Sequence, residues 1–117
     1  MLDLTETWLP TQAEFDAFAA VSGDDNAIHV DEDFAARTGF GRTVSHGMLI
    51  YAKFWGMVQR HTPGLRQINQ AMMFPNPCYA GEEVVLRVTG DVPGTLTLRA
   101  FRRADDAELL LAETEVA

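Results

Sequence analysis

Residues 45–61, SHGMLIYAKFWGMVQRH, form the longest run with helical spacing in the chain and are the main guide to its fold. Apolar residues recur there at steps of three and four, which is the period of one helix face. The expected stripe consists of Met48, Ala52, Trp55 and Val58 or Gln59, widened by Leu49 and Ile50. Apolar residues nearly surround this segment, so it predicts a buried helix. We expect Ser45 to cap its start and Pro63-Gly64 to end it.

The residues before this helix predict shorter elements. An extended stretch covers residues 5–9 and ends at Pro10. Thr11 and Glu14 have the spacing of a capping box, which predicts a helix from Thr11 to about Val21. Residues 24–30 are expected to form a loop. Asp31 is expected to cap a second short helix through Thr38, with Gly39 as its stop.

The residues after the helix alternate in the manner of β-strands. The expected strands are Ile68–Phe74, Glu82–Thr89, Thr95–Arg102 and Leu109–Val116. Turns at 91–94 and 104–107 join the last three as hairpins. One buried helix beside an antiparallel sheet predicts an α+β fold, with the sheet wrapped around the helix. At 117 residues, the chain is expected to be a single domain, 1–117.

The charge balance argues against several classes of partner. The chain carries 17 acidic and 9 basic residues, a net charge of −8. Nucleic-acid affinity comes mainly from neutralising phosphates, so we expect no nucleic-acid partner, and by the same sign no membrane partner. A local basic patch remains compatible with this balance. Arg37, Arg42, Arg60 and Arg66 are the candidates for contact with a substrate phosphate.

Cysteine content and hydropathy point to a reducing compartment. Cys78 is the single cysteine, which leaves no intramolecular disulfide and no cysteine-based metal cluster. We read it as a small buried hydrophobic residue. The first residues lack a basic stretch followed by an apolar one, and no apolar run approaches a membrane span. We therefore expect a cytoplasmic location, and we expect no metal site.

Residues 22–29, SGDDNAIH, place carboxylates and an imidazole together after a helix stop. A loop of this length lets Asp24 and His29 converge on one water molecule, which general acid/base chemistry requires. The alternative is an ordinary turn with a surface histidine, since Asp, Asn and Gly are common turn residues. Asp25 is the second carboxylate and is read as solvated or structural.

Residues 40–48, FGRTVSHGM, run from a glycine-bearing loop into the buried helix. Unpaired N–H groups at a helix start favour negative charge, and Gly47 lets a ligand oxygen approach the backbone. This arrangement suits a thioester oxyanion. The alternative is a plain helix start capped by Ser45.

Three segments, taken together, resemble the MaoC-like, (R)-specific enoyl-CoA hydratase family. Residues 18–35, FAAVSGDDNAIHVDEDFA, are similar to its hydratase signature, an apolar helix end followed by Ser-Gly-Asp-x-Asn-Pro-x-His. Residues 44–49, VSHGML, resemble the helix start that follows that signature. Residues 77–84, PCYAGEEV, resemble its later Pro and Gly-Asp/Glu segment before a strand. The matches occur in the family's order and span about residues 15–90.

The resemblance implies a hotdog fold, usually dimeric, and a lyase that adds water to a trans-2-enoyl thioester or removes it from the hydroxyacyl product. It implies Asp24 and His29 as the catalytic pair and Gly47 N–H as the group that polarises the thioester carbonyl. The residues expected near the substrate are Asn26, Ser45, His46 and Met48. Asn26 is expected to hold the loop through hydrogen bonds to the backbone. The alternative for His46 is that it only packs at the start of the helix. No separate cofactor is expected, because coenzyme A or phosphopantetheine belongs to the substrate.

The sequence departs from the family at Ala27, where the family has proline, and in its short length. A non-catalytic acyl-thioester-binding hotdog module and a hotdog thioesterase are the rival functions. Thioesterases of this fold usually place their carboxylate on or near the central helix, and residues 45–61 contain none. An acyl carrier protein is a possible partner beside a small-molecule acyl thioester, and a homodimer is expected.

Overall fold

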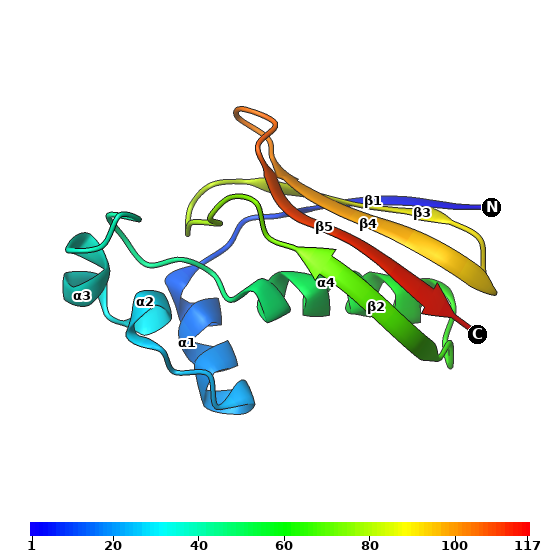
Figure 1. The fold of residues 1–117 in the computed structure, drawn as a ribbon, viewed down its shortest axis with the longest axis horizontal. Coiled ribbons are helices and arrows are strands. Elements are labelled where there is room, and N and C mark those ends of the chain that lie inside the picture. The colour runs from blue at the N-terminus through cyan, green and yellow to red at the C-terminus, as the bar shows by residue number, and fades with distance from the viewer.

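One long helix, α4 (Gly47–His61), lies along one face of a five-stranded antiparallel sheet (Figure 1). The computed structural model describes residues 1–117. The strands are β1 (Leu2–Trp8), β2 (Gln67–Met73), β3 (Val84–Gly90), β4 (Gly94–Arg102) and β5 (Glu108–Val116). Their order across the sheet is β1-β3-β4-β5-β2, so β1 and β2 form the two edges. The predicted α+β class and hotdog arrangement are confirmed.

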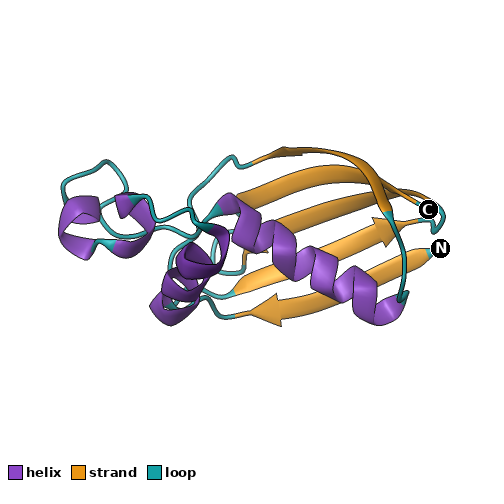
Figure 2. Ribbon diagram, turned by 90° about the horizontal axis from the view of Figure 1, so that it is seen from below, coloured by secondary structure: helices purple, strands orange, loops and turns teal.

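Strand pairing follows from the alternation in the sequence. β3 and β4 pair with Leu86 opposite Ala100, and β4 and β5 pair with Leu98 opposite Ala112, as the two predicted hairpins require. One face of these strands is apolar and packs against α4 in a single core cluster (Figure 2). β2 pairs with β5 rather than with the next strand in sequence, so the chain crosses from one side of the sheet to the other between β2 and β3.

The buried face of α4 differs from the predicted stripe. The residues of α4 that are buried against the sheet are Leu49, Ile50, Tyr51, Phe54, Met57 and Val58. The prediction was wrong for Met48, which is 48% exposed, and for Ala52, which is also exposed. Because α4 is apolar on several faces, spacing alone did not identify which face meets the sheet.

The start of α4 also differs from the prediction. His46, not Ser45, is the residue before the first helical turn, and no side chain caps it. Ser45 is instead buried, with its N–H donating to the carbonyl of Cys78 at 2.8 Å. The N–H groups of the first turn of α4 therefore have no side-chain partner.

Three shorter helices lie at the end of the molecule where α4 starts, beyond the end of the sheet (Figure 1). They are α1 (Gln12–Ser22), α2 (Ala27–Val30) and α3 (Glu32–Ala36). The predicted capping box of α1 is present, with Thr11 and Glu14 satisfying each other's backbone N–H groups. The loop predicted over 24–30 was wrong in its second half, where α2 forms, and α3 is shorter than predicted.

Glu14 connects α1 to the rest of the fold. Its carboxylate accepts hydrogen bonds from Lys53 of α4 at 2.7 Å and from the Trp8 ring at 3.0 Å. Burial alone would raise the pKa of Glu14, but these hydrogen bonds lower that pKa below its ordinary value of 4.5. α1 is thereby attached to both α4 and the end of β1.

Substitution of Phe54 tests how much the helix–sheet core contributes to the free energy of unfolding. Its side chain is 0% exposed within the core cluster. Phe54→Ala should lower the free energy of unfolding by about 3–5 kcal/mol, through lost apolar burial and a residual cavity. Urea denaturation measures this change. Val21→Ala is the control, because Val21 is 87% exposed; its effect should stay below about 0.5 kcal/mol. Equal effects of the two substitutions would contradict this packing.

Candidate active site

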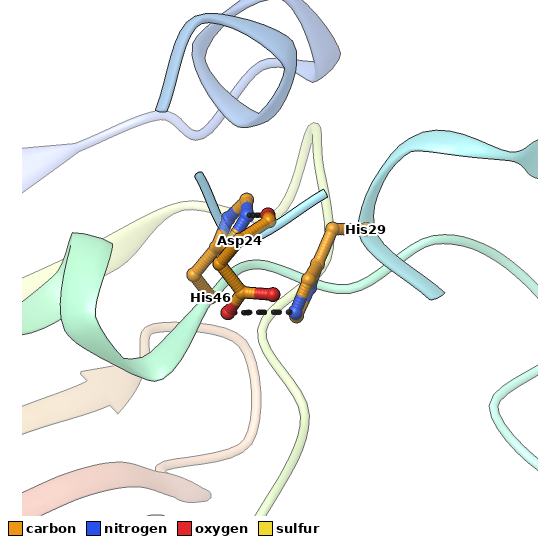
Figure 3. A group of neighbouring side chains, drawn as sticks. All are labelled: Asp24, His29 and His46. Carbon is orange, nitrogen blue, oxygen red and sulfur yellow. Dashed lines mark hydrogen bonds and ion pairs between the residues drawn. The ribbon is translucent and has the colours of Figure 1, made fainter. Parts of the chain in front are cut away.

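His29, on α2, has one ring nitrogen committed to the backbone. Its Nδ1 lies 2.8 Å from the carbonyl oxygen of Val44. A carbonyl only accepts hydrogen bonds, so Nδ1 carries the proton in this contact. In the neutral ring, Nε2 then holds the free lone pair, and it faces Asp24 (Figure 3). His29 is thus oriented as a base whose tautomer is fixed by main-chain geometry.

Asp24 lies on the segment between α1 and α2, and its carboxylate faces the ring of His29 (Figure 3). Its Oδ2 is 3.8 Å from His29 Nε2, which is longer than a direct hydrogen bond. The Asp24 side chain is 56% exposed, whereas that of His29 is 10% exposed. When His29 is neutral, both groups accept hydrogen bonds. A water molecule can donate one proton to each, and the arrangement therefore suits activation of a single water.

Local capping holds the segment that carries this pair. Gly23 ends α1 with a φ of 81°, a conformation that favours glycine. The Asn26 side chain accepts a hydrogen bond from the N–H of Ile28 and caps α2. Ala27 is the first residue of α2, where proline is favoured but not required. The Asn26 side chain thus stabilises the backbone at the start of α2 through this hydrogen bond.

His46 lies behind the pair and away from solvent. It is 1% exposed, and its ring stacks on that of His29 with centroids 3.8 Å apart and planes 22° apart. Its Nε2 lies 2.8 Å from the main-chain oxygen of Asp24 (Figure 3). Burial lowers the pKa of His46 below its ordinary value of 6.5; the hydrogen bond to Asp24 raises it, and the charge of His29 lowers it further.

Asp24, His29 and His46 each offer a ligand atom within 4.8 Å of the others. Their geometry does not suit a metal ion. Ring lone pairs lie in the ring plane, and the stacked rings of His29 and His46 hold them in two nearly parallel planes, whereas the ligands of one ion must converge on it. His46 Nε2 is also occupied by the Asp24 carbonyl. The cluster is arranged for proton chemistry instead.

A cavity of about 360 Å³ opens beside Asp24 and His29. The start of α4 forms part of its wall through Ser45, Gly47 and Met48. Its remaining lining is largely apolar and comes from Ile28, Phe40, Val44, Ile50, Phe74, Pro75, Asn76, Pro77, Cys78 and Leu109. The acid/base pair and the uncapped helix start therefore share one apolar cavity.

Five of the seven predicted site residues line this cavity: Asp24, His29, Ser45, Gly47 and Met48. Asn26 and His46 do not line it; Asn26 caps α2, as expected of a residue that holds the loop, and His46 packs at the start of α4. Met72 and Met73 line a separate groove over the sheet. Phe40 and Phe74 also line the cavity but were not predicted as site residues, since Phe40 only begins the segment 40–48 and Phe74 ends an expected strand.

Cys78 contributes to the cavity wall as a protonated thiol. It is 2% exposed, and burial raises the pKa of the thiol to about 12. Such a thiol does not act as a nucleophile near neutral pH. Cys78 therefore behaves as the small buried hydrophobic residue that was predicted.

The four candidate phosphate-binding arginines fall into two groups. Arg42 pairs with Glu82 at 2.9 Å, and Arg60 pairs with Glu6 at 2.9 Å. Arg37 and Arg66 are exposed and form no ion pair. Arg37, just after α3, is the unpaired one at the helical end of the molecule that carries Asp24 and His29.

Comparisons with known proteins give a family match and several similar proteins. Residues 3–92 match the profile of a family described as "MaoC like domain". The chain is 41% identical over 97 residues to an (R)-specific enoyl-CoA hydratase of Aeromonas caviae, covering 76% of this chain and 72% of that protein. It is 34% identical over 82 residues to a mitochondrial 3-hydroxyacyl-[acyl-carrier-protein] dehydratase of Arabidopsis thaliana, covering 70% of this chain and 49% of that protein.

A solved structure extends the likeness to almost the whole chain. The (R)-hydratase from A. caviae, described as involved in PHA biosynthesis, superposes with a TM-score of 0.87 at 32% identity. The match covers 98% of this chain and 92% of that one. The fold is therefore shared from β1 to β5.

The contact between Gly47 and Phe74 gives a test of the cavity wall. A Cβ atom on Gly47 would lie 2.6 Å from two carbons of the Phe74 ring, so Gly47→Ala must displace that ring. Phe74 is 44% exposed and can rotate outward. We therefore expect a coupling energy of about 1 kcal/mol between Gly47→Ala and Phe74→Ala.

Chemical denaturation of the two single variants, the double variant and the original protein measures this coupling. The alanine's own helix propensity cancels in the cycle because it is present in both backgrounds. Strictly additive single effects would show that the ring and the helix start do not meet.

Proposed function

Because the chain belongs to the MaoC-like domain family, we propose that it is a hydratase/dehydratase of acyl thioesters. The observation that carries the proposal is the placement of the Asp24–His29 pair and the uncapped start of α4 on one apolar cavity. The relatives named as hydratases and dehydratases support the same reaction class, that of a lyase. The substrate is a trans-2-enoyl thioester in the direction of hydration.

The proposed reaction begins with a water molecule held between Asp24 and His29. The pair removes one proton from this water, and its oxygen forms a bond to the β-carbon of the enoyl group. The electrons of the carbon–carbon double bond move to the α-carbon and the thioester oxygen, giving an enolate. The pair then returns a proton to the α-carbon, so that one water is added and no proton is gained or lost. Such acid/base help is worth about 10²–10⁴-fold in rate.

The start of α4 stabilises the enolate. Gly47 N–H lies in the first turn, where helix geometry leaves backbone N–H groups without intrahelical acceptors. No side chain caps this turn. A thioester oxygen that reaches Gly47 receives a hydrogen bond and the favourable field of the helix start. One such preorganised donor contributes about 3–4 kcal/mol to the transition state.

The two rival functions fit the molecule less well. Thioesterases of this fold usually place their carboxylate on or near the central helix, and α4 itself carries no Asp or Glu. A module that only binds thioesters has no need of a histidine whose tautomer is fixed opposite a carboxylate. The pair is therefore better explained by catalysis than by binding.

The substrate brings its own carrier, either coenzyme A or the phosphopantetheine arm of an acyl carrier protein. Both present the same pantetheine group to the cavity, and no further cofactor enters the proposed reaction. A net charge of −8 is less favourable for an acidic carrier protein than for a small thioester. Arg37 is the unpaired cation best placed to meet a phosphate.

A cytoplasmic location is proposed as well. Its support is the single cysteine, which is free and buried, as is usual in a reducing compartment. None of the helices has the length and apolar character needed to cross a membrane.

Substitutions in the pair test the reaction. Asp24→Asn and His29→Ala should each lower kcat for crotonyl-CoA by about 10²–10⁴-fold, because each removes half of the acid/base unit. Loss of the enoyl-thioester ultraviolet absorbance measures the rate. Asp25→Asn is the matched control, since Asp25 is the exposed neighbouring carboxylate. Near-original turnover in Asp24→Asn or His29→Ala would refute the assignment.

A homodimer is also proposed, on the basis of the β2 edge. β2 has no strand on its outer side, and Ile68 and Met73 are 53% and 58% exposed there. Pairing of two β2 edges would cover these side chains and satisfy the free backbone groups. Such a contact would lie close to Phe74 at the cavity wall.

Sedimentation equilibrium should give twice the 12.9 kDa chain mass, and Met73→Lys should shift the protein toward the monomer. Leu9→Lys is the control, because Leu9 is also 58% exposed but follows β1 at the opposite edge of the sheet. A monomer at all concentrations would rule out this assembly.

A further inference from the structure

His46 is a buried polar residue that the proposed reaction does not use. It precedes the first turn of α4, is 1% exposed and does not line the cavity. A buried imidazole that does not meet the substrate needs another physical reason for its position. Its contacts show what it holds in place.

The His46 ring donates through Nε2. The acceptor is the main-chain oxygen of Asp24, 2.8 Å away, so Nε2 carries the proton. Nδ1 is buried without a partner, and a proton there would be left unsatisfied. Burial, together with the charge of His29, lowers the pKa of His46. The neutral ring with one proton on Nε2 satisfies all of these observations.

This hydrogen bond connects the Asp24 segment to the central helix. The other hydrogen bonds of residues 23–26 are local. The N–H groups of Gly23, Asp24 and Asp25 donate to oxygens of Ala19, Ser22 and Gly23, respectively. The oxygens of Asn26 accept from the N–H groups of Ile28 and His29. They stay within α1, α2 and the segment between them. Only the His46 bond links these residues to α4, on which Gly47 lies.

Ring packing fixes the direction of that bond. His46 stacks on His29 at 3.8 Å, and Phe18 of α1 meets its ring edge-on at 4.9 Å. With two rings packed against it, His46 has little freedom to rotate away from Asp24. The titratable groups facing it are His29 from α2 and Asp24 from the connecting segment, and Phe18 is uncharged.

We infer that His46 is a positioning residue whose Nε2–H holds the main chain of Asp24 at the distance from Gly47 that hydration requires. The inference rests on the proposed function, because the geometry it maintains is that of the Asp24–His29 pair and the Gly47 donor. Displacement of a reacting group by about 1 Å can cost 10²-fold in rate, so a single anchoring bond is enough to matter.

Two variants separate the hydrogen bond from the packing. His46→Phe keeps a flat ring against His29 and Phe18 but has no donor, whereas His46→Gln loses the ring but keeps an N–H group at similar reach. We expect His46→Phe to lower kcat for crotonyl-CoA by about 10- to 100-fold while KM changes much less. His46→Gln should recover most of this loss. His61→Gln is the control, because His61 is exposed at the far end of α4.

A purely structural role would give another pattern. It would lower the melting temperature of both variants and leave kcat per folded molecule unchanged. Original kcat in folded His46→Phe would overturn the inference. Equal loss in folded His46→Gln and His46→Phe would also overturn it, because the ring and not the donor would then matter.

Amide hydrogen exchange tests the anchor without any reliance on catalysis. His46→Phe should accelerate exchange of the Asp25 and Ile28 amides by about tenfold relative to the original protein, since the segment loses its bond to α4. His46→Gln should show less acceleration. If the original protein fails to hydrate enoyl thioesters, the proposed function fails, and exchange still decides the role of His46. Unchanged exchange across residues 23–28 in His46→Phe would contradict it.

Discussion

The packing of α4 against the sheet is the constraint on which the rest of the molecule depends. Ile50, Phe54, Met57 and Val58 can leave water only by meeting the inward-facing residues of β3, β4 and β5. That contact fixes the direction of α4 and places its first turn at one end of the sheet. The short helices α1 to α3 lie at the same end, so the segment carrying Asp24 and His29 lies beside the start of α4 (Figure 1).

The ring nitrogens of the two histidines of the site form hydrogen bonds with main-chain oxygens. His29 binds the carbonyl of Val44, and His46 binds the carbonyl of Asp24. A carbonyl cannot donate, so each contact also decides which ring nitrogen carries the proton. The fold therefore sets both the position and the protonation pattern of the site, and Asp24 remains partly exposed where a water can enter.

The sequence predicted the features that depend on periodicity or on local chemistry. The strands of both hairpins and the capping box at Thr11 were predicted from these features, and Asp24 and His29, predicted to converge, lie 3.8 Å apart. The predicted buried stripe of α4 was wrong at Met48 and Ala52. The helix is apolar on several faces, and its packing against the sheet determines which of them is buried. α2 was missed because four residues are too few to show a helical period. The contact of His46 with Asp24 joins a side chain to a main-chain oxygen 22 positions away, which no spacing rule detects.

The proposed hydratase adds water across a double bond and leaves the thioester intact. Mass spectrometry of crotonyl-CoA incubated with the protein in H₂¹⁸O distinguishes this reaction from hydrolysis. Hydration should give 3-hydroxybutyryl-CoA with one heavy oxygen in its hydroxyl group and no release of free thiol. Free coenzyme A together with labelled crotonate would contradict it, because water would then have attacked the thioester carbonyl instead of the β-carbon.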